Sequence, residues 1–222
     1  MPMMNRKFPA FGLVALSAVA GIIAGVTALY VIGGPNGNID AGTVAETSCA
    51  AKERIAALDP AIGGEVAAML PADPSQSLSD LGFNGPDGKP LTVANLAGKT
   101  LLINLWATWC VPCRTEMPAL DALEREMGSD RFEVVAVNVD RGDDEKPKAF
   151  LQETGIKSLA YYRDSSLGIF NGLKTRGLAL GLPVTLLVDE KGCLLAHMNG
   201  PAEWASEDAK ELIRAALPPA EG

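Results

Sequence analysis

Residues 101–113 read Leu-Leu-Ile-Asn-Leu-Trp-Ala-Thr-Trp-Cys-Val-Pro-Cys. The first six residues form an apolar run typical of a buried strand, and the residues after Cys113 favour a helix. Cys110 and Cys113 therefore lie at a strand-to-helix corner, where unpaired backbone N–H groups and the helix dipole stabilise negative charge. A thiol at such a corner loses its proton more easily than a free cysteine, and the thiolate is the form that attacks disulfides. The corner is thus a candidate site of disulfide exchange.

The spacing of the two cysteines fits this chemistry. A separation of three positions at a helix start lets two sulfurs reach bonding distance without unwinding the backbone. Cys110 lies nearer the strand, so we expect it to be the exposed attacking thiolate. Cys113, one turn further on, is expected to be buried and to resolve the mixed disulfide.

Two other interpretations of a Cys-x-x-Cys pair are weaker here. A structural zinc site needs a complete set of Cys and His ligands, and the sequence has a single His and no second pair of this kind. A purely structural disulfide is disfavoured by the neighbouring Trp109 and Pro112. The sequence therefore predicts no metal site.

An uncharged segment occupies the N-terminal part of the chain. Residues 11–32 are almost wholly apolar or small, and at about 1.5 Å per residue they can cross a bilayer as a helix. Arg6 and Lys7 precede them, so residues 1–10 are expected to be cytoplasmic. The alternative is a cleaved signal peptide, whose apolar region is shorter, about 7–15 residues. We expect a retained single-pass anchor in the inner membrane, with the remainder in the periplasm.

The rest of the chain divides into a linking part and a main domain. Residues 33–74 are predicted to form a tether and a short helix that ends at Asp59-Pro60, and residues 75–222 the main domain. Strands alternating with helices, then a hairpin and a last helix, predict an α/β fold with a mixed sheet flanked by helices. The predicted strands are 81–83, 100–106, 132–139, 160–162, 184–188 and 193–198, and the predicted helices are 49–58, 110–127 with an interruption at Pro118, 144–153, 166–174 and 206–217.

Charge narrows the classes of partner. The formal net charge is −8 and the sequence pI is about 4.7. An acidic exported domain is a poor fit to nucleic acid and to anionic lipid surfaces. We therefore expect protein partners and no nucleic acid.

The remaining two cysteines, Cys49 and Cys193, form the natural second pair, because export permits disulfides and the total of four is even. A bridge closing so long a loop would stabilise the fold by about 4–5 kcal/mol in the chain-entropy model. A second redox centre is the alternative, but no local spacing motif supports it. We therefore predict a structural disulfide.

Several motifs together identify a family resemblance. Trp106-Ala107-x-Trp109-Cys110-x-Pro112-Cys113, Pro118 five positions later and Gly181-Leu182-Pro183 before a strand resemble the thioredoxin superfamily. With Arg114, Glu116 and Met117 following the cysteines, the chain resembles the membrane-anchored bacterial TlpA-like and ResA-like thiol–disulfide proteins. Cys49, Cys193 and the stretch 200–206 (Gly-Pro-Ala-Glu-Trp-Ala-Ser) are similar to the TlpA-like branch.

The resemblance implies a set of substrate-binding residues. Pro183 is expected to be a cis proline facing the sulfurs, so that Leu182 offers its backbone N–H and C=O to an extended substrate segment. An ordinary turn proline is the alternative from sequence alone. Trp109 is expected to give the substrate an apolar surface, and Pro112 to stiffen the corner.

Glu116 is the candidate proton donor and acceptor. It follows Cys113 by three positions and shares its helix face, where a partly buried carboxyl has a raised pKa. Thioredoxins carry an Asp at the position of Asn104, and ResA-like proteins carry a Glu at the position of Glu116. The alternative is an acid that serves the helix dipole or pairs with Arg114 or Arg125.

These observations predict a thiol–disulfide oxidoreductase that mainly reduces disulfides of exported proteins. The resemblance implies a role in cytochrome maturation, with copper-delivery proteins for cytochrome oxidase among the substrates. No cofactor motif is present, so electrons are expected from a membrane dithiol carrier. Two alternatives stay open: a disulfide oxidase or isomerase, and a non-enzymatic chaperone that holds Cu(I) between the two thiolates.

Overall fold

The structure of the protein, a computed structural model, describes residue 49 and residues 52–218. The anchor predicted at 11–32, residues 1–10 and most of the predicted tether lie outside these described residues. None of the helices within the described ranges combines the length and the apolar character needed to span a bilayer.

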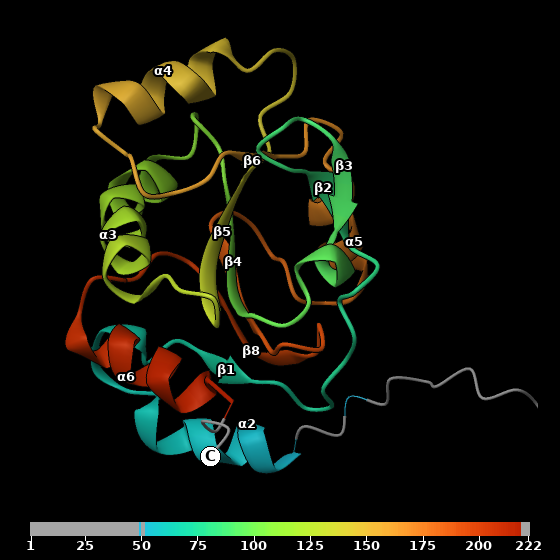
Figure 1. Cartoon of the computed structure of the whole chain (residues 1–222), viewed down its shortest axis with the longest axis vertical. Helices are drawn as coiled ribbons and strands as arrows, with labels where there is room; N and C mark the ends of the chain where they lie inside the picture. The colour runs from blue at the N-terminus through green and yellow to red at the C-terminus, as the bar shows by residue number, and fades with distance from the viewer. Residues whose placement is uncertain (1–48, 50–51, 219–222) are drawn as a thin grey trace, which may run out of the picture. The chain divides into compact units, whose positions relative to one another are not determined.

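One mixed sheet of eight strands organises the domain, in the order β1-β8-β7-β4-β5-β6-β2-β3 (Figure 1). At its centre, β4 and β5 are parallel, whereas β7 runs antiparallel to β4, and β8 antiparallel to β7. The central strands are β4 (Thr100–Trp106), β5 (Phe132–Asn138), β7 (Val184–Val188) and β8 (Leu194–Asn199), and the outer strands are β1 (Leu70–Pro71), β6 (Tyr162–Arg163), β2 (Gly82–Asn84) and β3 (Pro90–Thr92).

Helices cover both faces of this sheet. Figure 1 shows α3 on one side of the central strands and α5 on the other, with α2 beside α6. The α-helices are α2 (Lys52–Leu58), α3 (Val111–Met127), α4 (Glu145–Glu153), α5 (Gly168–Thr175) and α6 (Glu207–Ala216), and single 3₁₀ turns span Asp59–Ala61, Gly64–Val66 and Val93–Leu96. The predicted α/β fold, with a mixed sheet flanked by helices, is confirmed.

Burial explains why the central strands were recognisable in the sequence. Every residue of β4 and of β7 is buried, because these strands have neighbours on both edges and helices over both faces. Both strands are therefore mostly apolar along their length and do not alternate, and their buried polar residues are Thr100, Asn104 and Thr185. The predicted bounds 100–106 and 184–188 coincide with the observed ones. The β1 and β3 strands were not predicted, because each is very short and contains a proline, a residue that disfavours a strand assignment.

The interruption predicted at Pro118 is wrong: α3 continues through this residue as one helix. A proline inside a helix removes one hydrogen bond and costs about 3 kcal/mol. Here the helix buries Met117, Leu120 and Leu123 on either side of that point. Burial of such side chains contributes about 1.5–3 kcal/mol each, which outweighs the lost hydrogen bond.

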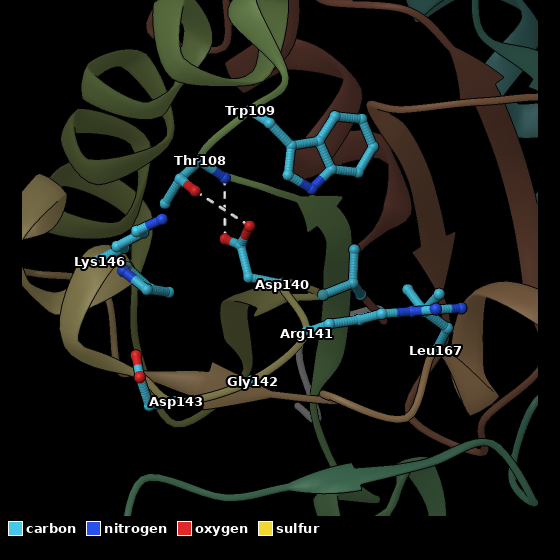
Figure 2. Close-up of a pocket in the computed structure, with 10 residues that line it drawn as sticks. Thr108, Trp109, Asp140, Arg141, Gly142, Asp143, Lys146 and Leu167 are labelled. Atoms are coloured by element: carbon cyan, nitrogen blue, oxygen red, sulfur yellow. Dashed lines mark hydrogen bonds between the residues drawn. The ribbon is translucent and has the colours of Figure 1, made fainter.

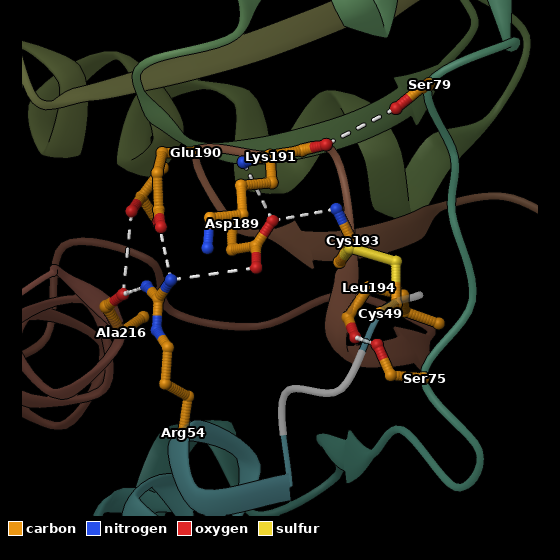
Figure 3. Close-up of polar contacts among 11 residues, drawn as sticks. Cys49, Arg54, Ser75, Ser79, Asp189, Glu190, Lys191, Cys193, Leu194 and Ala216 are labelled. Atoms are coloured by element: carbon orange, nitrogen blue, oxygen red, sulfur yellow. Dashed lines mark hydrogen bonds and ion pairs between the residues drawn. A yellow bond between two sulfur atoms is a disulfide. The ribbon is translucent and has the colours of Figure 1, made fainter. Parts of the chain in front are cut away.

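The folded domain begins before residue 75, where the sequence suggested a boundary. The β1 strand pairs with β8, and α2 packs against α6, so both belong to the same body as the sheet. Cys49 and Cys193 are joined by a disulfide, with their Cα atoms 5.5 Å apart and a sequence separation of 144 (Figure 3). The short helix and the linking residues that the sequence placed before the main domain are therefore integral to the fold.

Arg54 strengthens this attachment (Figure 3). Its guanidinium donates to the Glu190 carboxylate and to the Ala216 carbonyl, and it lies 3.6 Å from Asp189 Oδ2. One side chain of α2 thus holds the turn between β7 and β8 together with the end of α6.

Candidate active site

The two cysteines of the motif are oxidised to a disulfide at the start of α3, with their Cα atoms 5.3 Å apart. Cys110 is the N-cap of the helix, and the backbone N–H of Cys113 donates to Cys110 Sγ over 3.3 Å. Pro112 fits the first turn, where its missing N–H leaves no bond unmade. A negative charge on Cys110 would therefore meet an N–H donor and the positive end of the helix dipole.

Both sulfurs are largely covered in this oxidised state. Cys113 is fully buried, and Cys110 is only 5% exposed. The sequence predicted an exposed Cys110, and the exposed fraction is smaller than expected because its sulfur is bonded inward to a buried partner. Cys110 is still the more accessible of the two, which suits it to react first with another molecule.

Exposed apolar side chains flank the disulfide. Trp109 is 68% exposed and Val111 is 70% exposed, although large apolar residues are normally buried. Trp109 also lines a pocket of about 480 Å³. Figure 2 shows its indole above this pocket, opposite the Arg141 and Leu167 side chains. The surface beside Cys110 therefore carries exposed apolar side chains next to a hollow lined mainly by polar and charged residues, which suits contact with a protein segment.

Asp140 fixes the loop that carries Trp109 (Figure 2). Its carboxylate accepts the Thr108 backbone N–H at 2.8 Å and the Thr108 hydroxyl at 3.0 Å, and it also accepts from the Asn138 side chain at 2.8 Å. Asp140 follows β5, whereas Thr108 follows β4. Because these two strands are parallel, their carboxyl ends meet at the same edge of the sheet.

Glu116 lies in α3 one turn after Cys113 and is 3% exposed. Asn104 Nδ2 of β4 donates to its Oε1 over 2.9 Å. Its Oε2 accepts the Trp204 indole N–H at 3.0 Å and the Ala202 backbone N–H at 3.2 Å. The carboxyl group is thus held by three donors from two separate segments.

The surroundings of Glu116 give it an unusual acidity. Burial raises the pKa of Glu116 from 4.5 to about 7, although the hydrogen bonds from Asn104, Trp204 and Ala202 act in the opposite direction. A carboxyl with a pKa near neutrality takes up and releases protons at the pH of most cellular compartments.

The surface pairing considered for Glu116 is not what the structure describes. Arg125 lies near Asp121 and Glu126, and the Arg114 guanidinium stacks over the Phe150 ring at 5.2 Å. Among the described residues, no charged side chain forms a hydrogen bond or an ion pair with Glu116. Its hydrogen-bond partners are neutral groups, the Asn104 amide, the Trp204 indole and the Ala202 backbone N–H.

The Leu182–Pro183 peptide bond is cis, and the residues around it lead into β7. Leu182 is half-buried, and Leu180, two positions earlier, is 84% exposed. The Leu180 N–H donates to Asn199 Oδ1 over 2.7 Å, which ties this loop to the end of β8.

Metal ligands do not gather in the part of the chain that the structure describes: no group of three or more His, Cys, Asp or Glu side chains there is arranged to hold an ion. His197 lies in β8, and burial lowers its pKa. A neutral, partly buried histidine in a strand fits a structural role.

Sequence reasoning missed three groups at this site: Asp140, Trp204 and the Ala202 N–H. Asp140 carried a usable signal, since it follows a predicted parallel strand next to the one that ends at Trp106. Trp204 carried none, because it lies 88 positions from Glu116 and reads as a core residue. In the structure, Trp204 contacts Glu116, and Asp140 contacts the loop before Cys110.

Comparisons with known proteins agree with this geometry. The Redoxin family model matches residues 72–213. The chain is 32% identical to the thioredoxin-like protein YneN of Bacillus subtilis over 122 residues, which cover 54% of this chain and 67% of that protein. It is 30% identical to the thiol-disulfide oxidoreductase ResA of Halalkalibacterium halodurans, over 58% of this chain and 70% of that protein.

A solved structure shows the same likeness. A putative thiol-disulfide oxidoreductase from Bacteroides vulgatus superposes with a TM-score of 0.53 at 27% identity, and the match covers 67% of this chain and 97% of the other. Residues 72–213, which the Redoxin model matches, include Cys110 and Cys113. The chain therefore belongs to the redoxin family, among its thioredoxin-like thiol–disulfide oxidoreductases.

Proposed function

We propose that this protein is a periplasmic reductant of disulfides in exported proteins. The observation that carries the proposal is the Cys110–Cys113 pair at a helix N-terminus next to the buried carboxyl of Glu116. The helix end stabilises the attacking thiolate, and the carboxyl supplies a proton acceptor in the covered interior. Both are features of a group that exchanges disulfides rather than one that only stabilises a fold.

The reaction begins from the reduced pair. The Cys110 thiolate attacks one sulfur of a substrate disulfide, which forms a mixed disulfide and releases the other substrate sulfur as a thiolate. Cys113 loses its proton and attacks Cys110 Sγ, which restores the disulfide seen here and releases the second substrate thiol. Two electrons pass from the protein to the substrate, and the substrate sulfurs take up two protons.

Glu116 serves the second step. Cys113 is fully buried, so water cannot readily take its proton. Glu116 lies one helical turn away, and burial brings its pKa to about 7. In its ionised form it accepts a proton from the Cys113 thiol, and in its protonated form it leaves the buried site uncharged.

Substrate binding takes place on the surface beside Cys110. Trp109 offers an exposed apolar face, and Pro112 keeps the corner rigid. The backbone at Leu182, before the cis Pro183, pairs with an extended substrate segment. An extended segment on this surface places its disulfide over Cys110.

The other disulfide supports the compartment that we propose. A disulfide between Cys49 and Cys193 persists in an oxidising compartment, which supports export of the domain. The apolar segment 11–32, preceded by Arg6 and Lys7, supports an anchor in the inner membrane with the domain on the periplasmic side. A reductant in such a compartment needs a continuous electron supply, for which we propose a membrane dithiol carrier.

The substrates we propose are cysteine pairs that must stay reduced in order to receive a cofactor. These are the thiols of apocytochromes and of copper-delivery proteins for cytochrome oxidase. The motifs shared with TlpA-like and ResA-like proteins support this class of substrate.

Two measurements test the proposal. Equilibration of the purified protein with glutathione gives the reduction potential of the Cys110–Cys113 pair, expected near the reducing end of the range of about −270 to −120 mV for such sites. A value near the oxidising end would make the protein an oxidase. Cys113→Ser cannot resolve its mixed disulfide, so this variant should retain a substrate covalently attached to Cys110 in cells. Cys110→Ser is the matched control and should retain none.

A further inference from the structure

The segment between β8 and α6 reaches the active site from a distant part of the sequence. Residues 200–206 lead from the end of β8 to Ser206, the N-cap of α6. Two of their groups, the Trp204 indole N–H and the Ala202 backbone N–H, converge on a single atom, Glu116 Oε2. Trp204 is fully buried, so this contact is shielded from water.

We propose that Trp204 is a positioning residue of the redox reaction, which orients the Glu116 carboxyl beside the cysteines and stabilises its ionised form. The inference rests on the proposed role of Glu116 and extends it. The catalytic group is Glu116, and Trp204 acts through it without touching the substrate.

The hydrogen-bond donors of the two carboxyl oxygens of Glu116 differ in whether they also serve another acceptor. Oε1 has one donor, Asn104 Nδ2, and this amide also donates to Thr185 Oγ1 at 2.9 Å. Oε2 has an indole N–H that donates to nothing else. Since an indole nitrogen is a donor only, this contact favours an oxygen that carries charge or a lone pair and disfavours a carboxyl O–H at the same position. Trp204 therefore favours the ionised carboxylate of Glu116 over the protonated acid.

Among the described residues, no charged side chain bonds to Glu116 in addition to these neutral donors. The partners of Glu116 from β4 and from residues 200–206 are all neutral, and Cys113, one turn earlier on its own helix, is held in the disulfide. Within the described residues, the ionised carboxyl is therefore stabilised by hydrogen bonds alone. A charge-assisted hydrogen bond in such surroundings is among the stronger ones in proteins.

The test is Trp204→Phe in the full-length oxidised protein, where the Cys110–Cys113 thiols do not titrate. The phenyl ring keeps much of the buried apolar volume and removes the N–H. The readout is the pH midpoint of the Glu116 carboxyl resonance by ¹³C NMR, assigned by its loss in Glu116→Gln. We expect the midpoint to rise by about one pH unit or more, the effect of one hydrogen bond to a charged group.

Trp106→Phe is the matched control. Trp106 is the other tryptophan with almost no exposure, and it packs against Phe150 at a ring distance of 5.5 Å rather than against Glu116. This control should leave the Glu116 midpoint unchanged. If Trp204→Phe does not fold, benzothienylalanine at position 204 keeps the bicyclic shape and also lacks the N–H.

The functional readout is the pH profile of mixed-disulfide resolution by the reduced protein. It should move to higher pH in Trp204→Phe, and Trp204→Phe should add no further shift in a Glu116→Gln background. An unchanged midpoint in a folded Trp204 variant would overturn the inference. If Trp204→Phe shifts the Glu116 midpoint as expected but the wild-type protein reduces no disulfide, the inference stands and the proposed function is overturned.

Discussion

Asn104 Nδ2 lies 2.9 Å from Glu116 Oε1, and this contact joins the central strand β4 to the helix that carries the two cysteines. Asn104 carries an amide, which does not titrate. The structure places it as a donor to Glu116 instead. The acid of this site therefore lies on the helix, and the strand holds it in place.

The acidity of Glu116 makes the stability of the protein depend on pH. In the folded state Glu116 keeps its proton up to a pKa of about 7, whereas the unfolded chain loses it near 4.5. Between these values the folded state binds more protons, so the free energy of unfolding falls as pH rises. The stabilisation that Glu116 contributes is fully present below about pH 4.5. It falls by roughly 3 kcal/mol between about pH 4.5 and about pH 7, and it changes no further at higher pH.

Glu116→Gln should remove this slope, because an amide does not titrate. Urea denaturation of the oxidised protein at several pH values from about 5.5 to about 8 measures how the free energy of unfolding depends on pH. Glu126→Gln is the control, since Glu126 is a partly exposed carboxyl on the same helix whose pKa is lowered by Lys210. Equal slopes in wild type and Glu116→Gln would contradict the acidity we describe.

Asn104→Asp should turn the site into a pair of carboxyls. Two carboxyl groups at hydrogen-bond distance share a proton, so the pair titrates in two steps and one of them lies above the pKa of Glu116 alone. The fold should persist, because Asp is close to Asn in shape. Alkylation of Cys110 by iodoacetamide, followed from mildly acidic to alkaline pH, should show its Glu116-dependent step at higher pH.

Glu116→Gln supplies the reference for that experiment, because it should lack the step altogether. If wild type, Asn104→Asp and Glu116→Gln give the same alkylation profile, the ionisation of Glu116 does not affect the reactivity of Cys110.

Asp140→Ala should slow substrate reduction by freeing the loop that carries Trp109. The change leaves the Thr108 N–H, the Thr108 hydroxyl and the Asn138 amide without their acceptor. Each buried donor left unpaired costs about 1–3 kcal/mol, so stability should fall as well. Insulin reduction at a temperature well below the unfolding midpoint separates the two effects.

Asp143→Ala is the matched control for Asp140→Ala. Asp143 lines the same pocket, but it is exposed, and among the described residues its carboxylate accepts a hydrogen bond only from the nearby Glu145 N–H, while its backbone carbonyl, which the substitution keeps, accepts from Arg163. Its removal should change neither stability nor activity by much. A loss of activity equal to that of Asp140→Ala would assign the effect to the charge of the pocket rather than to the loop.

Removal of the second disulfide should lower stability and leave the chemistry intact. Cys49 and Cys193 close a loop with a sequence separation of 144, for which the chain-entropy model gives about 5 kcal/mol. The double variant Cys49→Ser/Cys193→Ser, unfolded in urea without reductant, should show a loss of that order or less. Its insulin reduction at low temperature should match wild type, whereas a folded but inactive double variant would indicate a second redox centre.

The sequence alone determined the features that depend on near neighbours. The strands at 100–106 and 184–188 are continuous apolar runs, the Cys-x-x-Cys pair follows the first of them, and Ser206 caps the last helix. These follow from local patterns, because burial on both faces and helix capping each leave a mark within a few residues.

Only the tertiary structure decided how the site is completed. The continuous helix through Pro118, the attachment of β1 and α2, and the contacts of Asp140 and Trp204 all join segments far apart in the chain or depend on packing energy. Trp204 reaches Glu116 across 88 positions because β8 returns antiparallel to β7 and the segment that follows β8 brings the indole to α3. The acidity of Glu116 is set there, since it depends on which groups exclude water from the carboxyl and which donate to it.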